Sequence, residues 1–100
     1  MILEVAPLSV RPEQTEAFEE AFRQAQKIIS AMQGYVSHEL QRCLEQKNLY
    51  ILLVRWLTLE DHEIGFRKSP QYQEWKQLLH HFYEPFPTVL HYESVTGVGD

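Results

Sequence analysis

Several residue types that constrain or anchor a chain are scarce in this sequence. Cys43 is its only cysteine, which excludes an intrachain disulfide and a cysteine-rich metal site, so we expect it to be a small filler side chain in a strand. Only four glycines and five prolines interrupt a chain that is 44% hydrophobic, and this composition excludes a disordered protein. No apolar run is long enough to cross a membrane and the chain begins as a strand, so we expect a cytoplasmic protein without membrane contact.

Basic residues are outnumbered. Nine Lys and Arg against 14 Asp and Glu give a net charge of −5, and the basic residues are scattered along the chain. A nucleic-acid-binding surface needs a basic face or stripe, so we exclude nucleic acid as a partner. The length of 100 residues fits one domain, which we place at residues 1–96 with a tail at 97–100. A domain of this size would gain core from a second copy.

An amphipathic helix is the clearest element of the first half. It follows a strand expected over residues 2–10, and Pro12 suits its first turn. Its apolar residues recur at spacings of three and four, as one face of a helix requires. They are Phe18, Ala21, Phe22, Ala25, Ile28, Ile29 and Met32. Gly34 is expected to end the helix as a left-handed cap.

Residues 35–44 and 49–57 predict two strands joined by a turn, an antiparallel hairpin. In the first strand His38 lies on one face and Tyr35 on the other. The second strand is apolar on both faces apart from Arg55, so both faces need a cover.

Capping patterns divide the second half of the chain. Thr58, with Asp61 three residues later, is typical of the start of a short helix, and Ser69–Pro70 is typical of the start of another. Alternating residues predict a last strand over 88–95. The order β-α-β-β-α-β predicts an α+β, ferredoxin-like fold with an antiparallel sheet. Because one strand is apolar on both faces, we expect a homodimer packed sheet to sheet, a dimeric α+β barrel.

Candidate chemistry lies between the third strand and the last helix. His62 could take a proton from a phenol or quinol, or hold the resulting anion; alternatively, it is an exposed histidine on a first helical turn. Tyr72 could donate a hydrogen bond to a substrate oxygen. Trp56, Phe66 and Trp75 could form the walls of an aromatic pocket. The spacing of Tyr72 and Trp75 also fits plain core packing, and the two interpretations are compatible.

Arg55 and the other histidines have open roles. Arg55 interrupts the most apolar strand, so we expect partial burial and an ion pair, within the chain or across the dimer, with a carboxylate such as Glu39 or Glu93; holding an anionic substrate is the alternative. His80 and His81 are adjacent and point about 100° apart on a helix, so they cannot chelate one ion together. His38 and His91 could approach each other or the pocket. No metal-binding spacing is present, and we expect no metal.

The element order and several short motifs resemble the antibiotic biosynthesis monooxygenase family of the dimeric α+β barrel group, over roughly residues 1–95. The motifs are Arg11–Pro12, Gly34–Tyr35 and the segments 52–56, 59–62 and 66–72. The resemblance implies a homodimer with a pocket between the sheet and the helices of each subunit. Family members include oxygenases of quinols and aromatic phenols that use neither metal nor flavin, in which the deprotonated substrate itself reduces oxygen.

The family's site residues carry over in part. Tyr72 matches a tyrosine of the oxygenases that act on aromatic phenols, whereas His62 and Phe66 stand where these oxygenases have asparagine and tryptophan. Haem-degrading members have an asparagine and a histidine where this chain has Ala6 and Lys76. The resemblance therefore implies a cofactor-independent monooxygenase that acts on an aromatic or quinol-type small molecule with molecular oxygen, with His62 and Tyr72 as catalytic residues. The alternative is a non-catalytic, ligand-binding or stress-related dimer of the same fold.

Overall fold

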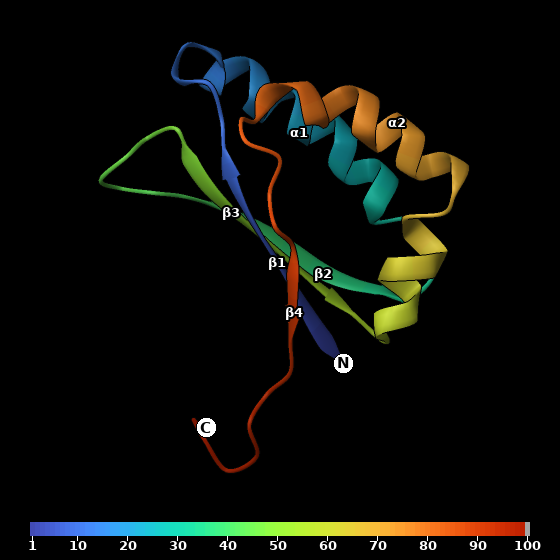
Figure 1. Ribbon diagram of the computed structural model, residues 1–100. Coiled ribbons are helices and arrows are strands. Elements are labelled where there is room, and N and C mark those ends of the chain that lie inside the picture. The colour runs from blue at the N-terminus through green and yellow to red at the C-terminus, as the bar shows by residue number, and fades with distance from the viewer. Residues whose placement is uncertain (100) are drawn as a thin grey trace.

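The computed structural model describes residues 1–99 and places both long helices on one face of a four-stranded antiparallel sheet (Figure 1). The strands are β1 (Ile2–Ser9), β2 (Tyr35–Arg42), β3 (Leu49–Trp56) and β4 (Leu90–Tyr92), and the helices are α1 (Thr15–Ile29) and α2 (Pro70–Leu79). Short helical turns span Pro12–Gln14, Asp61–Phe66 and His80–Phe82. The sheet order is β2-β3-β1-β4. The predicted β-α-β-β-α-β order and the ferredoxin-like α+β fold are confirmed.

The core lies between the sheet and the two helices. The predicted stripe of α1 supplies Phe18 and Phe22, and the inward side chains of β1 and β3 include Leu8 and Val54; all four are buried. Gly34 has the predicted positive φ, +83°, although it follows a turn after α1 and leads directly into β2. None of the helices within residues 1–99 has the length and apolar character that a membrane span needs.

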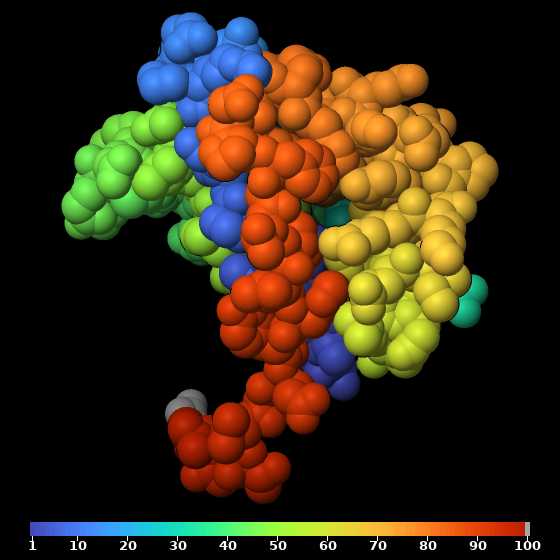
Figure 2. Space-filling model, in the orientation of Figure 1, coloured from blue at the N-terminus to red at the C-terminus, as the bar shows by residue number. Residues whose placement is uncertain are grey.

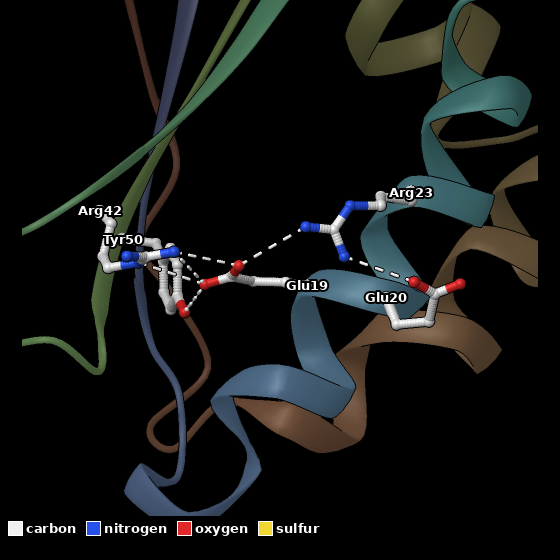
Figure 3. Close-up of polar contacts among 5 residues, drawn as sticks. All are labelled: Glu19, Glu20, Arg23, Arg42 and Tyr50. Atoms are coloured by element: carbon white, nitrogen blue, oxygen red, sulfur yellow. Dashed lines mark hydrogen bonds and ion pairs between the residues drawn. The ribbon is translucent and has the colours of Figure 1, made fainter.

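A polar cluster joins α1 to the hairpin (Figure 3). The Glu19 carboxylate of α1 accepts hydrogen bonds from Tyr50 Oη of β3 at 2.6 Å and from Arg42 Nη2 of β2 at 2.9 Å. The bond from Tyr50 lowers the pKa of Glu19, and burial together with Glu19 raises the pKa of Tyr50 to about 12. Arg23, one turn further along α1, lies 3.8 Å from the same carboxylate. These contacts hold α1 against the β2–β3 hairpin.

Two strand predictions were wrong in detail. Tyr35 packs edge-on against Trp56, on the same face as His38, because the β2–β3 pairing is irregular between Tyr35 and Ser37. The last strand covers Leu90–Tyr92 and not 88–95. The two strands are antiparallel, and β1 begins at Ile2, so β1 offers almost no partner residues to the chain beyond Tyr92. At the other end of β4 the pairing stops before Pro7 of β1, which has no N–H to donate.

The chain after β4 extends away from the body of the molecule (Figures 1 and 2). Val95 and Val98 are exposed there. The tail predicted at 97–100 is described as far as Gly99, and Asp100 lies outside the described residues.

Residues 1–99 leave the sheet face opposite the helices without a cover. It presents Ile51 and Leu53 of β3 and Leu90 and Tyr92 of β4, of which Leu90 and Tyr92 are about half exposed. Arg55 points to this face and is exposed. Among residues 1–99 it forms no ion pair, so the expected pairing is absent within one chain, and its pairing and burial across a dimer stay a prediction. Strand alternation explains this position, because Arg55 lies on the outer side of a strand whose inner side is the core.

Candidate functional site

A buried carboxylate lies on the inner face of β1, where the other inward side chains are apolar. Glu4 is only 6% exposed and precedes Ala6 and Leu8, each 3% exposed, on the same face. Its Oε1 atom accepts a hydrogen bond from the indole Nε1–H of Trp56 on β3 at 3.0 Å. A buried carboxylate destabilises the folded protein unless polar groups surround it, so Glu4 requires polar neighbours.

His62 is a second polar neighbour of Glu4, and a capped helical turn directs it inward. The backbone N–H of Asp61 donates to Thr58 Oγ1 at 3.1 Å, as the capping pattern predicts. The turn Asp61–Phe66 is a π-helix, a form that is often found at functional sites. His62 and Phe66 both point into the protein and are 2% exposed. The alternative of an exposed His62 is therefore excluded.

Both ring nitrogens of His62 are engaged within the protein. Nε2 lies 3.3 Å from Glu4 Oε1, and Nδ1 lies 2.8 Å from Nε2 of His91 on β4. The imidazole also stacks on Trp56, with ring centroids 5.4 Å apart and planes 25° apart. His91 is the strand partner of Glu4 in the β1–β4 pairing, so backbone register brings the two ends of this chain of polar groups together.

Burial favours the neutral forms of both Glu4 and His62. It raises the pKa of Glu4 from 4.5 to about 7, although the Trp56 hydrogen bond and the charge of Arg67 act in the opposite direction. It lowers the pKa of His62 to about 3, and the charges of Arg67 and His91 add to this effect. His62 is a weak base here, whereas Glu4 titrates near neutral pH.

A cavity of about 390 Å³ lies beside these groups, between the sheet and α2. Aromatic side chains form much of its wall. Phe66 packs edge-on against Tyr72, with centroids 5.3 Å apart, and against Trp75, with centroids 5.6 Å apart. The volume is at the lower end of the range of about 300–1,000 Å³ that is typical of small-molecule sites. A molecule of one or two aromatic rings suits this space and these walls.

Tyr72 and Arg67 are polar side chains of the cavity wall whose polar groups have no partner within residues 1–99. Ser69 caps α2 through its Oγ, which accepts from Tyr72 N at 3.1 Å, and this places Tyr72 on the first turn above the cavity. The Tyr72 hydroxyl makes no hydrogen bond to the described residues, and burial raises its pKa, so it stays protonated at neutral pH. Arg67 follows the π-helical turn and contributes a positive charge that no described carboxylate pairs.

The structure brings four of the five predicted site residues to one cavity: His62, Phe66, Tyr72 and Trp75. Trp56 does not line it. Its fully buried ring lies behind His62 and reaches the site through its hydrogen bond to Glu4.

The remaining histidines are separated. His80 lines the cavity and packs edge-on against Tyr72, and burial lowers its pKa to about 4. His81 is exposed, and His38 bonds through Nε2 to Gln26 of α1 at 3.0 Å. Within the part of the chain that the structure describes, no three His, Cys, Asp or Glu side chains gather as metal ligands would.

Sequence reasoning missed Glu4 and Arg67. A signal for Glu4 was present, since it is the one charged residue among the alternating inward positions Glu4, Ala6, Leu8 and Val10 of the first strand. Arg67 carried no comparable signal, because a basic residue after a short helix is ordinarily solvated.

A larger hollow of about 600 Å³ lies on the other side of the sheet, between Pro7, Ile51 and Phe86. None of the predicted site residues lines it. It belongs to the uncovered outer face, and its surface is mostly apolar, although Gln41 and Arg42 are among the residues that line it.

Comparison with known proteins agrees with this architecture. Residues 1–78 match the model of the family described as antibiotic biosynthesis monooxygenase. The chain belongs to this family. A curated relative, the uncharacterized protein YczJ of Bacillus subtilis strain 168, is 55% identical over 95 residues, which cover 95% of this chain and 100% of YczJ.

Solved structures of family members share the fold. A Bordetella bronchiseptica protein, provisionally named an antibiotic biosynthesis monooxygenase, is 32% identical with a TM-score of 0.90, over 94% of this chain and 96% of its own. SnoaB from Streptomyces nogalater, described as a cofactor-independent oxygenase, has a TM-score of 0.83 at 16% identity, over 99% of this chain and 97% of its own. At that identity the second likeness concerns the fold alone.

Proposed function

We propose that this protein is a cofactor-independent monooxygenase that acts on an aromatic or quinol-type small molecule in the cavity beside Glu4. The observation that carries the proposal is the cavity itself. It combines aromatic walls from Phe66 and Trp75 with a hydroxyl, a carboxyl and a guanidinium group that line the same cavity. Membership of the antibiotic biosynthesis monooxygenase family supports the reaction class.

The residues of the cavity suit a substrate that reacts as an anion. In such a reaction the substrate loses a proton, its anion reduces molecular oxygen, one oxygen atom enters the ring system and the other leaves as water. An anthrone or hydroquinone supplies all the electrons that this step needs. The Tyr72 hydroxyl donates to the substrate oxygen, and the positive charge of Arg67 stabilises the anion as it forms. His62, whose nitrogens are both engaged, orients its neighbours.

Oxygen uptake with a panel of anthrones and hydroquinones tests this function, with spontaneous oxidation in buffer subtracted. We expect the wild-type protein to consume oxygen with at least one of them, and Tyr72→Phe to lower kcat about tenfold or more because one donor to the oxyanion is lost. Tyr92→Phe is the matched control, since Tyr92 lies on the outer face of the sheet and outside the cavity. Ligand binding without oxygen uptake would favour the non-catalytic alternative, which the engagement of both His62 nitrogens supports.

We also propose that the protein forms a homodimer in which the outer faces of two sheets pack against each other. The apolar, uncovered side chains of β1, β3 and β4 support this arrangement, and Arg55 would then find its partner across the interface. Sedimentation velocity at micromolar concentration tests it. We expect a dimer that Leu53→Asp dissociates, whereas a wild-type monomer would refute the arrangement.

A further inference from the structure

The two carboxylate oxygens of Glu4 have different surroundings. Oε1 accepts from Trp56 Nε1–H at 3.0 Å and lies 3.3 Å from His62 Nε2. Oε2 has no hydrogen-bond partner among residues 1–99, although Glu4 is part of the cavity wall. One oxygen is therefore held by the protein, and the other is left for whatever occupies the cavity.

The histidine pair fixes how Glu4 is held. A neutral His62 that directs an N–H at the ionised Glu4, 3.3 Å away, carries its proton on Nε2, and its Nδ1 then accepts the hydrogen bond from His91 Nε2–H. His91 occupies the β4 position directly opposite Glu4, so the backbone pairing of β1 and β4 sets this arrangement. His91 and His62 are thus joined by a hydrogen bond, and Nε2 of His62 faces the Glu4 carboxylate at 3.3 Å.

We propose that Glu4 is the proton acceptor of the cavity, and that His62 and His91 are positioning residues that present its free oxygen to the substrate. The proposal rests on the proposed function, because it assigns the deprotonation step of that reaction. The substrate O–H bond breaks and a new O–H bond forms on Glu4 Oε2, while the electron pair remains on the substrate oxygen. The same proton later returns to the reduced oxygen atom, which takes its second proton from the oxygenated carbon of the substrate and leaves as water, so Glu4 is ionised again after each turnover.

Glu4 is also the group of this site whose pKa lies near neutral pH, as a proton acceptor requires. The titratable and charged groups around it are His91 on β4, His62 and Arg67 at the π-helical turn, Tyr72 on α2, and His80 and Tyr83 beyond α2. Burial lowers the pKa values of the three histidines and raises those of the two tyrosines, so all five are neutral at pH 7. The raised pKa of Glu4, about 7, leaves it poised between acceptor and acid.

Binding of 2-naphthol as a function of pH tests the assignment without requiring turnover. As Glu4 ionises, the O–H of the naphthol gains a charge-assisted hydrogen bond, so we expect its affinity to rise about tenfold as pH rises through 7. Two matched controls lack this rise: 2-methoxynaphthalene, which cannot donate, and Glu4→Gln, whose amide keeps the shape of the side chain but does not ionise. Circular dichroism verifies that the variant is folded. If 2-naphthol binds the wild type with no dependence on pH, the assignment of Glu4 is wrong; if it does not bind at all, the proposed function fails as well.

Turnover and the His91 variants give the second readout. With a substrate found active in the oxygen assay, we expect kcat to rise through about pH 7 in the wild type and to fall about 10²- to 10⁴-fold in Glu4→Gln. His91→Val should move the pH profile with KM unchanged, and His91→Gln, which keeps an N–H donor for His62 Nδ1, should restore it. An active wild type whose rate and pH profile survive in Glu4→Gln would overturn the inference and leave the proposed function standing.

Discussion

The buried carboxyl of Glu4 makes the stability of the folded protein depend on pH in a way that one substitution isolates. Glu4 has a pKa of about 7 in the folded protein and 4.5 when solvated. A carboxyl whose pKa is raised by folding contributes stability that is fully present below pH 4.5 and is lost as pH rises through 7. At about 1.4 kcal/mol for each pKa unit, this rise from 4.5 to about 7 corresponds to about 3 kcal/mol.

Glu4→Gln removes this titration and keeps the hydrogen bond from Trp56. Urea unfolding of both proteins at one fixed concentration, in steps from pH 4.5 to 8, measures the difference in free energy of unfolding. We expect the wild type to lose about 3 kcal/mol relative to the variant across this range, with the steepest change between pH 5 and 7. The opposing contributions of His62 and His80 occur in both proteins and cancel in the difference. A difference that stays flat would show that Glu4 is ionised in the folded protein at all these pH values, and it would remove the basis for its role as an acceptor near neutral pH.

Two further substitutions test the fold around the site. Gly34→Ala should destabilise the protein by about 2 kcal/mol or more, because φ is +83° and the new Cβ would lie 2.1 Å from Asp61 Cγ; Gly97→Ala, also at positive φ but in open space, is the control in thermal unfolding. An equal, small effect at both positions would contradict the close contact. Tyr50→Phe removes the 2.6 Å hydrogen bond to Glu19, and we expect a loss of about 1–2 kcal/mol in urea unfolding, whereas an unchanged midpoint would show that the cluster does not hold α1.

The sequence was sufficient for the fold where local patterns and tertiary packing agree. The stripe of α1 and the caps at Thr58 and Ser69 depend on short-range spacing, and the structure has them where the sequence predicts them. The end of β4 depends on where its partner β1 begins, and the face of Tyr35 depends on a bulge, so neither could be deduced from alternation alone.

The candidate site was predicted on its helical side only. His62, Phe66, Tyr72 and Trp75 belong to one segment, so helical spacing was enough to group them. Glu4 joins them from more than fifty residues away, through the pairing of β1 with β3 and β4. The protonation states required the structure too, because the depth of burial, which shifts the pKa values of Glu4 and His62 in opposite directions, is a property of the packed fold.

The structure of the protein with a bound hydroquinone, prepared without oxygen, tests the central claim most directly. We expect the ring beside Phe66 and Trp75, with one hydroxyl within hydrogen-bonding distance of both Tyr72 Oη and Glu4 Oε2. A ring bound instead in the hollow on the outer face of the sheet, or an inner cavity that stays empty at saturating hydroquinone, would contradict the account.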